Sequence, residues 1–137
     1  MRYIKVFLVL TSFAVARDIP QDLTLAGKWQ VTEFEEEAVT QRFEKTIWIF
    51  RENKTFTMMT PDGDFDGRYE EVSGGTTRKL LLYINGERHP SPALYKIEGG
   101  TLYLKHADSR EVKTYPEDFK KAPGYDTYKF SWVEKAP

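Results

Sequence analysis

Leu23-Thr24-Leu25-Ala26-Gly27-Lys28-Trp29-Gln30-Val31 is the stretch that decides the fold. Its short apolar lead-in is followed by a predicted strand over residues 28–35, in which bulky and polar side chains alternate. Successive side chains of a strand point to opposite faces, so Trp29, Val31 and Glu33 are predicted to share one face. The chain therefore opens with a strand that presents a tryptophan to one side.

The remainder of the chain repeats this pattern, with short strand-like segments separated by turn residues about every ten positions. Asn85-Gly86 and Gly99-Gly100 supply the positive φ angles that tight hairpins need. The predicted strands cover residues 28–35, 45–51, 55–60, 65–72, 79–84, 93–97, 101–105 and 125–133. Eight strands in sequential hairpins predict an all-β, eight-stranded up-and-down antiparallel barrel, because closure removes both sheet edges.

One stretch interrupts the rhythm of strands and turns. In residues 115–121, Pro116 stands at a suitable first helical position and acidic residues follow it. Proline and acidic side chains are both favoured in the first turn of a helix. The sequence therefore predicts one short helical turn before the last strand.

The first sixteen residues differ in composition from the rest of the chain. Arg2 and Lys5 precede an apolar run over residues 6–15, which ends in Ala14-Val15-Ala16. This pattern predicts a signal peptide over residues 1–16, cut after Ala16, and a barrel domain over residues 17–137. The run is shorter than the roughly 20 residues of a membrane-spanning helix, so no membrane span is expected after cleavage. The expected location is secreted or periplasmic, and a buried N-terminal strand or helix is the alternative.

Composition excludes several classes of protein. The formal net charge of −1 provides no basic surface for nucleic acid, so no nucleic-acid partner is expected. The absence of cysteine excludes disulfides, thiolate metal sites and cysteine nucleophiles. An exported domain without disulfides depends on its core alone, which fits a bacterial protein.

Four blocks occur in a characteristic order along the chain. They are residues 25–29, 66–69, 93–102 and 115–119. In this order they resemble a lipocalin-like family of uncharacterised exported bacterial proteins, abundant in planctomycetes. Two positions depart from the family pattern: Tyr115 stands where the family has arginine, and Gly100 stands where it has aspartate.

The resemblance implies a calycin-type fold and an exported setting, and it brings no established activity. In the lipocalin superfamily the tryptophan of Gly-x-Trp closes the barrel floor and a basic residue packs over its ring. The resemblance therefore implies a structural floor of Gly27 and Trp29, with Lys129 or Lys135 as a cation–π cap.

Two patterns bear on metal binding. The stretch from Asp62 to Gly67 begins like a calcium-binding loop, but the twelfth position of such a loop falls on Ser73 instead of glutamate. A hairpin turn is therefore the interpretation. The two histidines, His89 and His106, are not coupled in sequence. We expect no metal site, no cofactor and no catalytic residue, since nucleophile-elbow and phosphate-loop motifs are also absent.

The aromatic residues suggest where a ligand would bind. The predicted barrel-lining, ligand-binding residues are Trp48, Phe50, Phe56, Met58, Tyr69, Tyr83, Tyr95 and Tyr103. An eight-stranded barrel is either packed solid or holds one small ligand. The leading hypothesis is non-enzymatic binding of a small hydrophobic ligand in the barrel. The alternatives are a closed barrel acting as a protein-interaction or envelope-associated module, its partner unknown, and a hydrolase or isomerase in the same shell.

Overall fold

A computed structural model describes residues 19–20, 22–39, 45–72, 78–108 and 113–137, and its regular elements are all strands. The strands are β2 (Gly27–Phe34), β3 (Glu37–Ala38), β4 (Ile47–Phe50), β5 (Thr55–Thr60), β6 (Gly63–Val72), β7 (Arg78–Ile84), β8 (Ser91–Glu98), β9 (Thr101–Ala107) and β10 (Tyr125–Glu134). Each long strand pairs antiparallel with the next one along the chain, and β10 pairs back onto β2.

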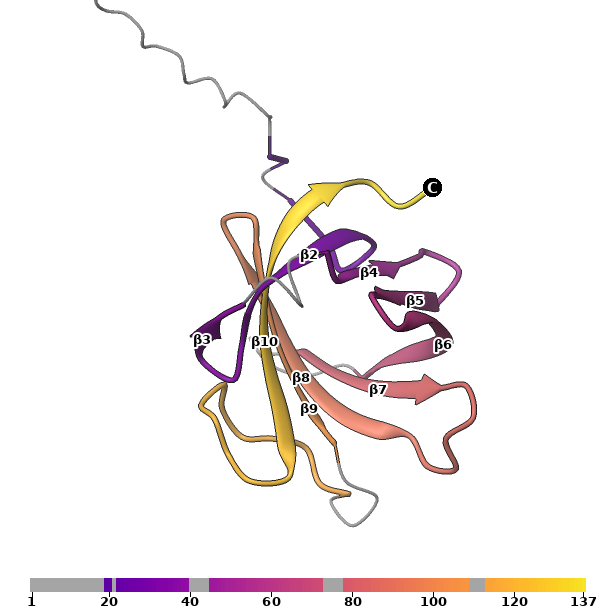
Figure 1. Ribbon diagram of the computed structural model, residues 1–137, viewed down its shortest axis with the longest axis vertical. Coiled ribbons are helices and arrows are strands. Elements are labelled where there is room, and N and C mark those ends of the chain that lie inside the picture. Colours follow the sequence, from indigo (N-terminus) through magenta and orange to yellow (C-terminus); the bar gives the residue numbers. More distant parts are fainter. Residues whose placement is uncertain (1–18, 21, 40–44, 73–77, 109–112) are drawn as a thin grey trace, which may run out of the picture.

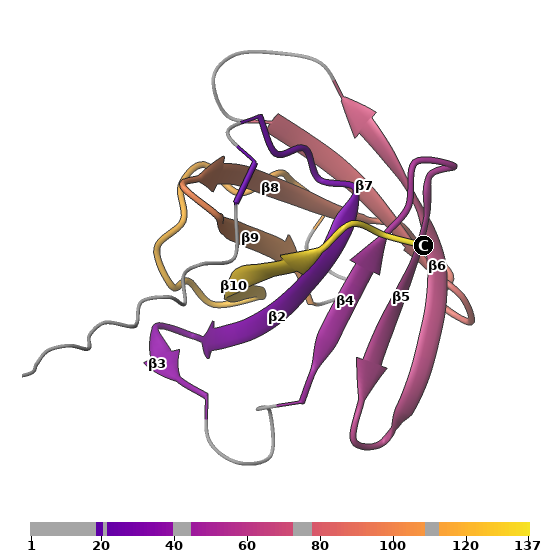
Figure 2. The same cartoon turned by 90° about the horizontal axis from the view of Figure 1, so that it is seen from above.

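The eight long strands form a closed barrel, which Figure 2 shows as a ring of strands. The prediction of an all-β, eight-stranded up-and-down antiparallel barrel is confirmed. The connections β7–β8 and β9–β10 lie at the lower end of the barrel in Figure 1, and the C-terminus lies at the upper end, near the start of β2. The two ends of the barrel therefore differ in what covers them.

A two-residue strand, β3, was not predicted. Glu35 and Glu36 have φ angles of 55° and 66°, which turn the chain sharply after β2. The turn brings β3 antiparallel to the end of β2, where Ala38 pairs with Glu33. Beyond this turn, Val39 packs against the barrel core.

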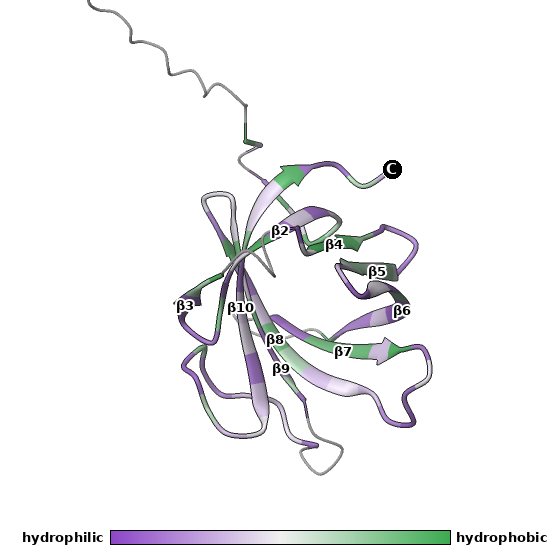
Figure 3. Cartoon of the chain, viewed as in Figure 1, coloured by the Kyte–Doolittle hydropathy of each residue, from purple (hydrophilic) through white to green (hydrophobic). Residues whose placement is uncertain are grey.

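The inward side chains fill the barrel around Trp29. On β2, Trp29 pairs across the sheet with Trp48 of β4 and with Trp132 of β10. The largest fully buried side chains are Trp29, Tyr95, Phe50, Phe56, Phe130, Leu80, Leu82, Leu102, Leu104 and Val31. Each such side chain contributes about 1.5–3 kcal/mol by leaving water. Hydrophobic residues, green in Figure 3, dominate β4 and β7, as expected for strands that supply this core.

A β-bulge in β2 reverses the predicted orientation of one side chain, Glu33. On β10, Phe130 pairs with Val31 and the adjacent Lys129 pairs with Glu33, so Thr32 is an extra residue in β2. A bulge reverses the alternation beyond it. Glu33 therefore points outward with Lys129 and does not share the face of Trp29, as the sequence had predicted.

The predicted helical turn over residues 115–121 is wrong. The Asp118 carboxylate accepts a hydrogen bond from the Lys120 amide at 3.0 Å, and the ammonium of Lys105 on β9 donates to the Lys120 carbonyl. Side chains that bond neighbouring backbone groups compete with helix formation. Phe119 also packs against Tyr103, with ring centroids 6.2 Å apart. The segment, residues 113–124, is therefore held against the outer face of the barrel as an irregular strap.

The predicted signal peptide, residues 1–16, lies outside the described residues. Within the described part of the chain, no helix has the length and apolar character to cross a membrane. The proposed boundary between residues 16 and 17 remains a prediction.

Gly67 allows two neighbouring strands to pack at very close range, which gives a test of the fold. A Cβ at this position would lie 2.4 Å from the Tyr83 carbonyl oxygen and 2.7 Å from the Phe56 ring. Because the backbone oxygen cannot move away freely, Gly67→Ala is expected to lower the free energy of unfolding by about 1–3 kcal/mol. Denaturant unfolding measures this loss. Asp64→Ala, at an exposed position of the same strand, is the control and should cost less than about 0.5 kcal/mol; equal losses would contradict the close approach.

Candidate functional site

Six of the eight predicted lining residues lie on inward-facing strand positions. They are Trp48, Phe50, Phe56, Met58, Tyr69 and Tyr95. Several of them contact one another directly: the ring centroids of Phe50 and Tyr69 are 5.3 Å apart, and those of Phe50 and Phe56 are 5.6 Å apart. These side chains mainly fill the barrel.

The placement predicted for Tyr83 and Tyr103 is wrong, because both lie on the outer face. Tyr83 pairs with Arg68, whose guanidinium sits 3.8 Å from the centre of the Tyr83 ring. Tyr103 pairs with Lys96 and Lys129, and both ammonium groups lie near its ring. Neither tyrosine contributes to the interior, since inward positions on these strands belong to their leucine neighbours.

The end of the barrel next to the lead-in residues is closed. The Trp29 indole N–H donates to the Leu25 carbonyl at 2.9 Å, and both residues are buried. A Cβ on Gly27 would lie 3.2 Å from the Trp132 indole nitrogen and 3.4 Å from that of Trp29. The Gly-x-Trp pattern thus has a steric reason: glycine leaves room for two indole rings.

Of the two residues predicted to cap Trp29, Lys129 lies elsewhere. Lys129 points outward and forms an ion pair with Glu33 at 3.3 Å, so the role predicted for it over Trp29 is wrong. Its strand position alternates with the inward Phe130. Lys135 is exposed beyond β10, beside a surface hollow that Trp132 also lines.

Two inward tyrosines already use their hydroxyl groups. Tyr69 donates to the Arg51 carbonyl, and Tyr95 donates to Glu71 Oε1 at 2.7 Å. Burial raises the pKa of Tyr69 to about 12, and burial together with the bond to Glu71 raises the pKa of Tyr95. Burial opposes ionisation of Glu71, but hydrogen bonds from Tyr95 and Lys54 outweigh it and lower the pKa of Glu71. Both tyrosines therefore serve structure at the closed end.

The opposite end of the barrel is less completely filled. Phe34, Met58, Ile84 and Tyr128 point inward there and are only partly buried. Phe65, which pairs with Met58 on the same inward face, is 46% exposed. Packing thus loosens from the Trp29 end to this open end.

A polar network lies at the same open end. The buried His106 Nδ1 is 2.9 Å from the Ala107 carbonyl oxygen and 3.2 Å from Ser91 Oγ. Because a carbonyl only accepts, Nδ1 carries the proton and Nε2 is the acceptor. Nε2 in turn faces Asp126 Oδ2 at 3.8 Å. The Ser91 hydroxyl donates to the Ala107 carbonyl, so His106 does not act as a base toward it.

Burial sets the charges of this network. It raises the pKa of Asp126 to about 7, and the nearby Asp108 and Glu35 carboxylates add to the shift. It also raises the pKa of Glu35, whose Oε2 atom is buried without a hydrogen-bond partner among the described residues. Burial lowers the pKa of His106. Burial therefore disfavours the charged forms of both Asp126 and His106.

Sequence reasoning did not single out Ser91, His106 and Asp126 as a group. They come from three strands, and register brings them together: Asp126 pairs with His106, and His106 pairs with Ala93 beside Ser91. The sequence did contain one clue that His106 points into the barrel. It is separated by even numbers of residues from the buried Leu102 and Leu104, and such residues of a strand share one face.

The residues considered for metal binding have other roles or surroundings. Asp66 accepts a hydrogen bond from Thr57 at 2.7 Å in the β5–β6 hairpin, and His89 is exposed in the β7–β8 connection, whereas His106 is buried. The described residues contain no group of three or more His, Cys, Asp and Glu side chains arranged to hold a metal ion.

A closed up-and-down barrel, plugged at one end beneath a Gly-x-Trp strand, defines the class of small lipocalin-type barrels. Comparison with known families agrees with the geometry, because the sequence profile of the lipocalin-like domain matches residues 25–121. The chain belongs to this lipocalin-like family. Comparison with curated proteins and with solved structures gave no match.

The raised pKa of Asp126 predicts a pH-dependent stability. Between the unfolded pKa of 3.8 and the folded value of about 7, the folded state holds a proton that the unfolded state has lost. This contribution is complete below the unfolded pKa and disappears as the pH rises through about 7. Wild type should therefore lose at least about 1.4 kcal/mol relative to Asp126→Asn between about pH 5 and about pH 8.

Denaturant unfolding at both pH values measures this difference. Asp118→Asn is the control, because a hydrogen bond from the Lys120 amide lowers the pKa of Asp118, so that this carboxyl does not titrate in the same range. A constant difference between wild type and Asp126→Asn would contradict the assignment of a buried, protonated Asp126.

Proposed function

We propose that this protein is an exported binding protein that takes a small apolar ligand at the open end of the barrel. The observation that carries the proposal is the exposed Phe65 on an inward-facing position, next to the partly buried Met58. Inward-facing apolar groups are normally covered in a barrel, and an exposed apolar surface with a polar surround is typical of a binding site. The site is shallow, since Trp48 and Phe56 fill the barrel below it.

The partly buried aromatic groups favour an apolar partner. Tyr128 contacts both Phe34 and Trp48, with ring centroids 5.0 and 5.1 Å apart. The neighbouring His106 and Asp126 add a few polar groups that would orient a ligand. The Ser91 hydroxyl donates its proton to the Ala107 carbonyl, so it is not oriented toward His106 as a nucleophile would be. This supports binding without catalysis.

Export is supported by residues 1–16, with their basic start, apolar run and small residues before the cleavage position. The same pattern supports a secreted or periplasmic location.

A second function is favoured by the solid packing around Trp29. If the open end takes no ligand, the same closed barrel would act through its outer faces, as a protein-interaction or envelope-associated module. The two functions differ in whether a small molecule accompanies the purified protein.

Native mass spectrometry of protein purified from its host tests the proposal. The expected result is a chain that lacks the first sixteen residues and carries a small apolar molecule. Phe65→Ser should weaken binding of the uncharged fluorescent dye N-phenylnaphthylamine about five- to tenfold, because part of a phenyl contact is lost.

The matched control is Val72→Ser, an exposed apolar residue at the other end of the same strand, 36% exposed. It should leave dye binding unchanged. Absence of any bound molecule and equal dye binding by both variants would reject the ligand-binding proposal and favour the interaction module.

A further inference from the structure

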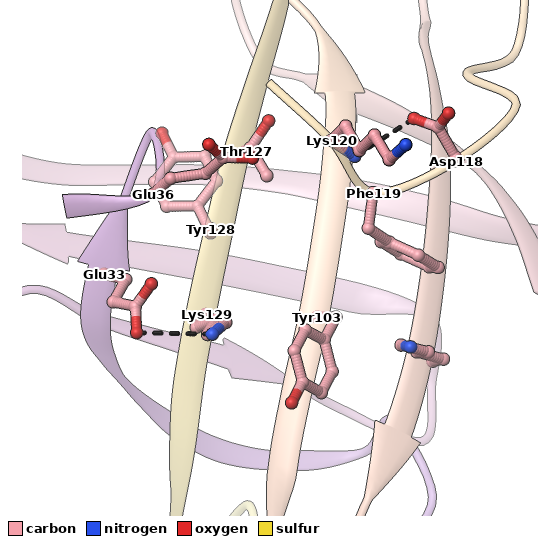
Figure 4. A pocket seen from close by; sticks show the side chains of 10 residues that line it. Glu33, Glu36, Tyr103, Asp118, Phe119, Lys120, Thr127, Tyr128 and Lys129 are labelled. Atoms are coloured by element: carbon pink, nitrogen blue, oxygen red, sulfur yellow. Dashed lines mark hydrogen bonds and ion pairs between the residues drawn. The ribbon is translucent and has the colours of Figure 1, made fainter. Parts of the chain in front are cut away.

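A groove of about 520 Å³ lies on the outer face of the barrel and borders the open end at Tyr128. Figure 4 shows it between the end of β2 and the strap of residues 113–124, across β10, β9 and β8. Its lining includes Tyr103, Phe119, Lys96, Lys129 and Thr127. Apart from Tyr128, the residues that line this groove differ from those of the proposed ligand site at Phe65 and Met58.

The wall formed by the strap is firmly built. The Lys105 ammonium, only 3% exposed, binds the Lys120 carbonyl and lies 3.4 Å from Asp118 Oδ1. On the opposite side, Glu36 accepts a hydrogen bond from the Lys121 amide at 3.0 Å, which joins the strap to the β2–β3 turn. The groove is therefore a fixed feature of the fold, held by buried and backbone contacts.

The floor is aromatic and surrounded by ammonium groups. Lys96 Nζ lies 4.7 Å from the centre of the Tyr103 ring and 5.1 Å from that of Phe119. Lys129 Nζ lies 5.5 Å from the Tyr103 ring on its other side. A planar ligand on these rings would place its edge among cationic donors.

The acidic groups of the groove are already engaged by N–H donors. Glu36 and Asp118 accept backbone amides, and Glu33 pairs with Lys129. The carboxylate partner of Lys96 is Glu98, at 3.7 Å, which does not line the groove. Ion pairs between such solvent-exposed groups are weak, so an incoming carboxylate can compete for both lysines.

Thr127 supplies an independent observation. It lines the groove and is 7% exposed, and its Oγ1 has no hydrogen-bond partner among the described residues. A buried hydroxyl without a partner is costly. An acceptor oxygen from a bound molecule would satisfy it.

We propose that the groove between the strap and β10 is a second binding site, which takes a small planar carboxylate. The aromatic body rests on Tyr103 and Phe119, and the carboxylate lies among Lys96, Lys129 and the Thr127 hydroxyl. The two lysines provide the charge complementarity, and the aromatic floor provides the preference for a planar molecule.

The test uses naphthoate as the probe and naphthalenemethanol as its uncharged counterpart, followed by amide chemical shifts. Naphthoate, titrated to about 1 mM, should shift the amides of Tyr103, Phe119 and Thr127. It should bind at least about fivefold more tightly than the alcohol, since an exposed charge-assisted contact contributes about 1 kcal/mol.

Two variants separate the site from general effects on the fold. Thr127→Val keeps the shape of the side chain and removes the hydroxyl, so it should weaken naphthoate binding several-fold without lowering stability. Tyr103→Thr should also weaken binding. Tyr83→Thr is the matched control, because Tyr83 is likewise an outer-face tyrosine with a cation, Arg68, over its ring.

Shifts confined to Phe34, Met58 and Phe65 would overturn the proposal and place the probe at the open end. Equal binding of acid and alcohol would also overturn it. The proposal would also be overturned if a glutamate-rich peptide shifted the amides of the groove residues and naphthoate did not.

Discussion

The structure depends on the close packing of Trp29 where the barrel closes. Its strand, β2, pairs with both β4 and β10. Trp29 is therefore flanked by Trp48 on one side and by Trp132 of the last strand on the other. Its indole N–H is bonded to the Leu25 carbonyl, and Gly27 leaves the space that Trp132 needs beside it. Closure by β10 then removes the exposed edges that an open sheet would have.

This constraint decides where function can lie. Among the described residues, Trp29 and nine other bulky side chains are fully buried together, and close-packed interiors have little room for a ligand. Binding is therefore directed to two places: the open end, where Phe65 and Met58 are incompletely covered, and the outer groove beneath the strap. The sites differ in chemistry, since the first is mainly apolar and the second carries lysines around an aromatic floor.

Hydrophobic alternation and turn residues were enough to predict the strands and the sequential barrel, because hairpin connections leave few arrangements. Failures arose where a non-local contact overrides a local pattern. The bulge at Thr32 turns the Glu33 side chain to the outer face. Lys105, on another strand, binds the Lys120 carbonyl and so holds the segment that was predicted to be a helical turn in an irregular conformation. Tyr83 and Tyr103 were assigned by residue type alone, although their positions alternate with inward leucines.

The central claim is that packing weakens from the Trp29 end to the open end, and native-state hydrogen exchange tests it most directly. The amides of Val31, Tyr69 and Trp132, bonded to backbone carbonyls in the well-packed region, should exchange only through global unfolding. The amides of Glu35, Asn85 and Asp108 also have backbone partners, but at the open end, and should exchange through local opening at a lower free energy. Equal opening free energies in the two groups, or slower exchange at the open end, would contradict this account.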